Sequence, residues 1–174
     1  PGAGKKSFIA GADIKEMAVM NGDSGRKWAL AGEKVANLIE MAPQPVIGAI
    51  NGYALGGGCE MALACDFRYA SENAAFGQLE VKWGLSPCFG GTQRLPRAIG
   101  PGMARELLYS ARVIDAAEAL RIGLVNQVFP SSELLGAALR TAAEIRENSM
   151  TAVRFTKQSV NTGRDMDIRN AIYH

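Results

Sequence analysis

Apolar and polar residues recur along the chain with two different spacings, which predict helices and strands in alternation. In residues 25–42 the apolar positions are close to the helical period of 3.6 residues; they are Trp28, Leu30, Val35, Leu38, Ile39 and Met41. Pro43 and Pro45 end this helix, because a residue before proline avoids the helical conformation. The compact apolar run PVIGAING that follows, residues 45–52, predicts a buried strand of a parallel sheet.

The remaining elements are predicted from end signals as well as spacing. SFIAGAD, residues 7–13, predicts an extended segment that ends in a glycine-containing turn, and IKEMAVMNG predicts a short helix that stops at Asn21-Gly22. A later helix should begin near Gly91 or Thr92. Another, DAAEALRIG, has Asp115 as its N-cap and Gly123 just beyond its end.

The order of these elements predicts an α/β fold, because strands alternate with helices early and helices dominate late. Residues 131–149 and 150–163 are expected to form two further helices after the last strand, LVNQVFP. We therefore expect an α/β core with the functional loops over residues 1–130 and the start of a helical region over residues 131–174.

Composition removes several classes of function. The formal net charge is +2 and the basic residues are scattered, so bulk charge makes no case for a nucleic-acid or membrane partner. Three cysteines do not make a disulfide framework, which favours a reducing compartment. The one histidine is His174, the last residue, so an interior histidine triad or histidine-ligated zinc site is not expected.

Three consecutive glycines, Gly56 to Gly58, stand between an apolar run and a predicted helix in NGYALGGGCEMALACDFRYA. A phosphate-binding loop would require Gly-Lys-Ser/Thr, and a dinucleotide fingerprint would require G-x-G-x-x-G; neither is present. Two explanations stay open. The glycines could expose helix N–H groups as an oxyanion hole, or they could simply permit a tight, closely packed turn.

Two glutamates in apolar surroundings favour acid–base chemistry. Glu60 falls in the first turn of the predicted helix, and Glu80 follows a glycine-containing turn between Leu79 and Val81. Each alone could be a surface or capping residue. Together, and without an interior histidine, they suggest proton transfer by two carboxyl groups. Cys59 and Cys65 are six residues apart and point to different helix faces, which argues against a shared metal.

Four motifs in order resemble the crotonase (enoyl-CoA hydratase) family: SFIAGADIKEM, PVIGAINGYALGGGCEMALACDFRYA, AAFGQLEVKWGLSPCFGGTQRL and DAAEALRIGLVNQVF. The resemblance implies a crotonase-like spiral of ββα units with C-terminal helices, incomplete at both termini. It implies reversible addition of water across the 2,3 double bond of an acyl-CoA thioester. Presence of both glutamates favours hydration over isomerisation; an isomerase, a hydrolase or a non-catalytic fold remnant are the alternatives. Among relatives, bacterial short-chain 3-hydroxybutyryl-CoA dehydratases look most similar.

The resemblance also assigns roles by position. It implies an oxyanion hole made by the N–H groups of Ala12 and Gly57, with Glu60 acting chiefly as base toward water and Glu80 as the acid that protonates Cα. Further substrate-binding positions follow from the same motifs: Ala10, Asp13, Ile14, Lys15 and Cys88. The resemblance implies no metal and no cofactor beyond the coenzyme A of the substrate, a homo-oligomer (trimer or hexamer), and a cytoplasmic or mitochondrial-matrix location.

Departures from the family pattern raise three questions. Cys88 replaces a glycine in PCFGG, so it either crowds the pocket or is accommodated without effect. Leu79 stands where proline is common. Segments that precede and follow this stretch in the family are expected to be missing, which predicts an exposed sheet edge, an incomplete coenzyme A site and weak or no hydratase activity of the isolated chain.

Overall fold

The computed structural model describes residues 1–173 and contains two small sheets. The first has the order β1 (Ser7–Ile9), β3 (Tyr53–Leu55), β5 (Ala75–Gly77) and β6 (Ile114–Asp115). The second has the order β2 (Ile47–Ile50), β4 (Phe67–Ser71) and β7 (Gln127–Phe129). Neighbouring strands are parallel except β5 and β6. The predicted α/β class and the parallel placement of β2 are confirmed.

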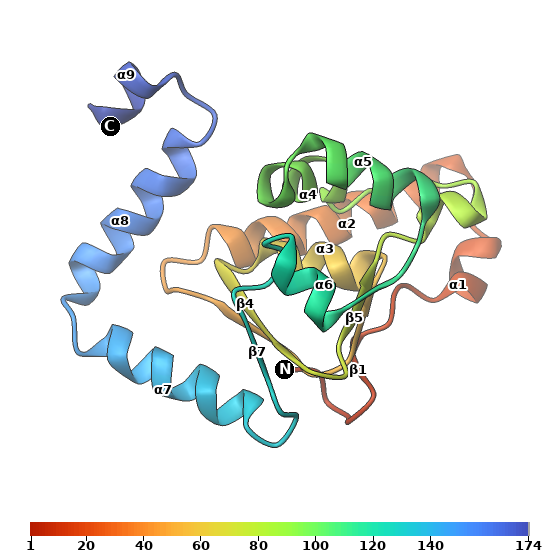
Figure 1. Ribbon diagram of the computed structural model, residues 1–174. Coiled ribbons are helices and arrows are strands. Elements are labelled where there is room, and N and C mark those ends of the chain that lie inside the picture. The colour runs from red at the N-terminus through yellow and green to blue at the C-terminus, as the bar shows by residue number, and fades with distance from the viewer. Residues whose placement is uncertain (174) are drawn as a thin grey trace.

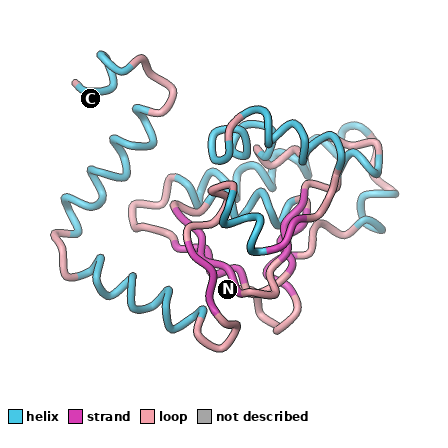
Figure 2. Tube along the Cα trace, in the orientation of Figure 1, coloured by secondary structure: helices cyan, strands magenta, loops and turns pink. Residues whose placement is uncertain are grey.

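Helices lie in the angle between the sheets and also on the outer face of one of them (Figure 1). The bounds are α1 (Ile14–Ala18), α2 (Gly22–Glu40), α3 (Gly57–Ala64), the 3₁₀ helix η1 (Glu80–Trp83), α4 (Gly91–Ile99), α5 (Pro101–Ser110), α6 (Ala116–Arg121), α7 (Leu134–Arg146), α8 (Met150–Gly163) and α9 (Ile168–Ile172). Figure 2 shows the strands as two arms of a V, and α3 and α6 each contact strands of both arms. None of the helices within residues 1–173 has the length and apolarity needed to cross a membrane.

The surroundings of strand β2 explain why its sequence is an unbroken apolar run. Side chains alternate between the two faces of a strand. Ile50 faces the main core, which also contains Phe76 and Leu95, whereas Ala49 faces a second cluster with Leu134 of α7. Because both faces of this sheet are covered, no position in β2 can be polar at low cost.

The last helices are attached differently from the rest. Helix α7 packs against β2, β4 and β7, but α8 and α9 contain no buried residue. Figure 1 shows α8 and α9 leading away from the sheets. Several large apolar side chains on these helices are exposed, at Phe155, Val160, Ile168 and Ile172, as is Tyr173 just after α9.

Most end signals were interpreted correctly, and one was not. Asp115 caps α6 by accepting from Glu118 N at 2.8 Å, and Gly123 has a φ of +79°, both as predicted. Asn21, however, does not mark a helix stop. It is the N-cap of α2 in a reciprocal capping box with Ser24, so α2 begins three residues before the predicted start. Strand β3 and helix η1 were not predicted.

Candidate active site

The triple glycine connects β3 to α3 by a turn that only small residues permit. Gly56 caps α3 with a φ of +52°, a conformation that residues with a side chain rarely adopt. A Cβ added to Gly58 would lie 1.9 Å from the Ile9 carbonyl oxygen, so the end of β1 lies directly against the first turn of α3. Close packing therefore explains Gly58. As the first residue of α3, Gly57 has an N–H group that the helix leaves without an intrahelical acceptor.

A pocket of about 770 Å³ opens beside this turn and gathers residues from distant parts of the sequence. Seven of the sequence-predicted site residues line it: Ala10, Ala12, Ile14, Gly57, Glu60, Glu80 and Cys88. Asp13 has a structural task instead, because its side chain caps α1 by accepting from Lys15 N at 2.9 Å. Lys15 itself is exposed.

Glu60 is a buried carboxylate held by two backbone donors. Only 1% of Glu60 is exposed, and its Oε1 accepts from Phe89 N at 2.8 Å and Gly91 N at 2.7 Å. Burial raises the pKa of Glu60, whereas the N–H groups of Gly91 and Phe89, and the charge of Arg94, oppose that rise. The ionised form therefore has dedicated partners within an otherwise unfavourable environment.

Glu80 titrates close to neutral pH. Burial raises its pKa from 4.5 to about 7, its own backbone N–H lowers it, and the charge of Glu60 raises it further. With the side-chain amide nitrogen of Gln78 turned toward Glu80, Gln78 donates to both carboxylate oxygens at 3.1 Å. A carboxyl group with this pKa can both give and accept a proton at neutral pH.

Cys88 is accommodated without backbone strain. Among the non-glycine residues of the range 1–173, Ala111 is the one with a positive φ, so φ of Cys88 is not positive. The backbone conformation at position 88 therefore does not require the glycine that Cys88 replaces. The thiol is exposed toward the pocket. Partial burial, followed by the charges of Glu60 and Glu80, raises the pKa of Cys88 to about 11, which keeps the thiol neutral.

Several residues of the site were missed from the sequence. The N–H groups of Phe89 and Gly91 and the buried amide of Gln78 belong to segments that only the fold brings to Glu60 and Glu80. Trp28 of α2 was interpreted as a packing or partly exposed residue; it packs against Phe89, with ring centroids 4.9 Å apart, and lines the pocket. Backbone donors leave no mark in a sequence, whereas Gln78 lies two positions before Glu80 and could have been noticed.

The chain is similar to known proteins over nearly its whole length. Residues 1–173 match the family model described as Enoyl-CoA hydratase/isomerase. The chain is 54% identical to a Short-chain-enoyl-CoA hydratase of Clostridium acetobutylicum and 53% identical to a Crotonyl-CoA hydratase of Syntrophomonas wolfei, covering 98% of this chain and 66% of each relative. A crystal structure of enoyl-CoA hydratase from Bacillus anthracis superposes with a TM-score of 0.96 at 46% identity, over 98% of this chain and 66% of that one. The chain thus spans just under two-thirds of the length of these relatives.

Proposed function

Because the chain belongs to the enoyl-CoA hydratase/isomerase family, we propose that it comes from an enzyme that adds water reversibly across the 2,3 double bond of an enoyl-CoA. The names of its relatives from Clostridium acetobutylicum and Syntrophomonas wolfei support a short-chain substrate such as crotonyl-CoA. The observation that carries the proposal is the presence of both carboxyl groups, Glu60 and Glu80, in one pocket with Ala12 and Gly57.

The backbone N–H groups of Ala12 and Gly57 are proposed to bind the thioester carbonyl oxygen. When water adds at Cβ, negative charge moves from the double bond onto this oxygen. Fixed donors stabilise that charge without having to reorganise, and losing one such donor costs about 3–4 kcal/mol in comparable sites. The contact of Gly58 with Ile9 supports this role, because it fixes the segment that leads to Ala12 relative to Gly57.

The two carboxyl groups are proposed to divide the proton transfers. Glu60, ionised with the help of its N–H partners, takes a proton from water while the hydroxyl oxygen bonds to Cβ. Glu80, with a pKa of about 7, gives a proton to Cα. The charge of Glu60 acts on Glu80, so the apparent pKa values in a pH–rate profile belong to the pair.

Acid, base and oxyanion donors are all supplied by the chain, so the proposed reaction needs no cofactor besides the coenzyme A of the substrate.

We propose a homo-oligomer as well. The exposed apolar side chains of α8 and α9, Phe155 and Ile172 among them, support it, because such surfaces are commonly covered by another chain. The bacterial relatives support a cytoplasmic location, and a mitochondrial relative in Mus musculus leaves the matrix as the alternative.

The test is the loss of enoyl-thioester absorbance with crotonyl-CoA, measured for the enzyme from which the chain comes and for its Glu60→Gln and Glu80→Gln variants. We expect each substitution to lower kcat by at least about 100-fold, as for removal of a general acid or base. Glu72→Gln, at an exposed turn outside the pocket, is the matched control and should keep full activity. Full activity in both site variants would contradict the assignment; double-bond migration without hydration would select an isomerase.

A further inference from the structure

Arg94 and Glu60 are the two charged residues that are buried as whole residues within residues 1–173, and one residue connects them. Arg94 on α4 donates from Nη1 to the Phe89 carbonyl oxygen at 2.8 Å. The N–H of the same Phe89 donates to Glu60 at 2.8 Å. The guanidinium group therefore binds the carbonyl oxygen of the loop residue Phe89, and the N–H group of the same residue binds the Glu60 carboxylate.

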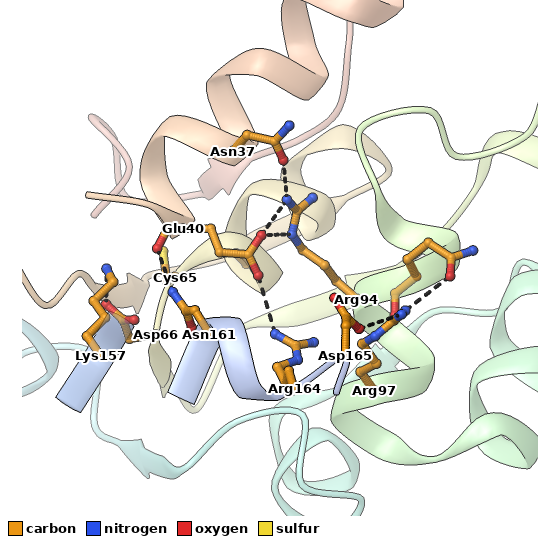
Figure 3. Close-up of polar contacts among 12 residues, drawn as sticks. Asn37, Glu40, Cys65, Asp66, Arg94, Arg97, Lys157, Asn161, Arg164 and Asp165 are labelled. Carbon is orange, nitrogen blue, oxygen red and sulfur yellow. Dashed lines mark hydrogen bonds and ion pairs between the residues drawn. The ribbon is translucent and has the colours of Figure 1, made fainter. Parts of the chain in front are cut away.

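The rest of the guanidinium group is fixed by α2. Its Nε and Nη2 both donate to Oε2 of Glu40, at 3.0 and 2.7 Å, and Nη2 also donates to Asn37 Oδ1 at 2.7 Å (Figure 3). Gly90 makes room for this arrangement, since a Cβ there would lie 2.1 Å from Arg94 Nη1. A planar fork with several donors suits this set of acceptors, and a lysine could not reach them all.

Helix α8 contacts the same anchor. Arg164 donates to the other carboxylate oxygen of Glu40, Oε1, at 3.3 Å, and Asn161 donates to the Glu40 carbonyl oxygen at 3.0 Å (Figure 3). Since α8 has no buried residue, these polar contacts, with the Lys157–Asp66 ion pair, fix where it lies. Both carboxylate oxygens of Glu40 are thus occupied, and the anchor of Arg94 has little freedom to turn away.

We propose that Arg94 is a positioning residue for Glu60: through the Phe89 carbonyl oxygen it holds the loop whose N–H groups bind the Glu60 carboxylate, and Glu40 of α2, steadied by α8, holds Arg94 in turn. The inference deepens the proposed function, and it rests on that function only where turnover is measured. The arrangement of hydrogen bonds itself does not depend on the reaction.

Charge acts in the same direction as geometry. The positive charge of Arg94 lowers the pKa of Glu60 against the effect of burial. Other titratable groups near Glu60 include Glu80, Cys59 and Cys88, because the charge of Glu60 raises the pKa of each. Removing Arg94 leaves Glu60 with these groups, and leaves Arg164 as the ion-pair partner of Glu40. The pKa of Glu60 should then rise, so that less of it is ionised at neutral pH.

The experiment is a ¹³C NMR titration of the Glu60 carboxyl carbon in protein with ¹³C-labelled glutamate, assigned with Glu60→Gln. Parent, Arg94→Gln and Arg94→Lys are compared, and the backbone amide signals of Phe89 and Gly91 are recorded in parallel. Arg97→Gln is the matched control. Arg97 lies on the same helix and forms an ion pair with Asp165 (3.1 Å), but it does not contact the loop that binds Glu60.

In Arg94→Gln we expect the Glu60 midpoint to rise, by up to about one pH unit, because the variant loses an opposite charge and the hydrogen bond that holds Phe89. Arg94→Lys keeps the charge and should restore at least half of that shift, while the Phe89 and Gly91 amide signals move in both variants. Arg97→Gln should change neither. If Arg94→Gln does not fold, the amide signals in Arg94→Lys decide.

An unchanged Glu60 midpoint with unchanged Phe89 and Gly91 amide signals in a folded Arg94 variant would overturn the inference; lowered stability alone would mean a merely structural role. Turnover of crotonyl-CoA adds an independent measurement: the acidic limb of the kcat/KM profile, which reports the free enzyme, should move to higher pH by the NMR shift. If the enzyme from which the chain comes does not hydrate crotonyl-CoA, the proposed function is refuted, but the NMR titration still tests Arg94.

Discussion

Glu80 makes a quantitative link between pH and stability. In the folded protein its pKa is about 7, against 4.5 for an isolated glutamate. The folded state therefore binds this proton more tightly than the unfolded chain does. The contribution of the site to stability is fully present below pH 4.5 and is lost as the pH rises through about 7.

Replacing Glu80 by glutamine removes this loss, because the amide is neutral at every pH. A rise from 4.5 to about 7, at about 1.4 kcal/mol per pKa unit, sets an upper value of about 3 kcal/mol. Because Glu80 is partly exposed, solvent screening reduces the expected gain to about 1–2 kcal/mol. Glu80→Gln should thus be more stable than the parent at pH 8 and similar to it at pH 4.5.

Urea unfolding, followed by circular dichroism at several pH values from 4.5 to 8, measures the free energy of unfolding of both proteins. Glu144→Gln, at an exposed position on α7, controls for loss of a negative charge as such. The reasoning would be refuted by a difference between Glu80→Gln and the parent that stays constant over this range. If the stability gain of Glu80→Gln grows with pH and the variant also loses enoyl-CoA hydratase activity, then Glu80 is maintained as the acid at a cost in stability.

Two further predictions concern the turn and the pocket. Gly58→Ala should lower the free energy of unfolding by about 1–3 kcal/mol or more, because the new Cβ would lie 1.9 Å from the Ile9 backbone oxygen, which cannot rotate away. Urea unfolding measures this change. An unchanged free energy of unfolding would mean that β1 can shift freely. With its pKa raised to about 11, Cys88 should react with iodoacetamide more slowly at pH 7.5 than an unperturbed thiol, and faster as the pH rises. Mass spectrometry follows the modification, and a fast reaction at pH 7.5 would contradict the raised pKa.

Local signals in the sequence predicted much of the fold. Helix α8 was predicted with its observed bounds, and α6 with its cap at Asp115, because spacing and caps are properties of neighbouring residues. Asn21-Gly22 was misinterpreted for a related reason: asparagine followed by glycine fits a helix end as well as a helix start, and the capping box with Ser24 decides between them.

The main residues of the candidate site could be predicted from the sequence, but the residues that hold them in place could not. Glu60 and Glu80 stand out as carboxyl groups in apolar segments, and the family motifs assign their roles. Arg94 does not stand out, because its partners Glu40 and Phe89 lie on another helix and in a loop, and the contact with Phe89 is to a carbonyl oxygen that every residue has. Such contacts follow from packing, which the local pattern of residues does not specify.

The donors that hold Glu60 have an evolutionary consequence. At position 89 the N–H belongs to the main chain, so any replacement except proline keeps this donor, although the buried ring also packs against Trp28. Position 91 supplies the second donor but has no such freedom, because a Cβ there would lie 2.9 Å from Glu60 Oε1. The first donor to Glu60 therefore survives a change of side chain at position 89, whereas the second requires glycine at position 91.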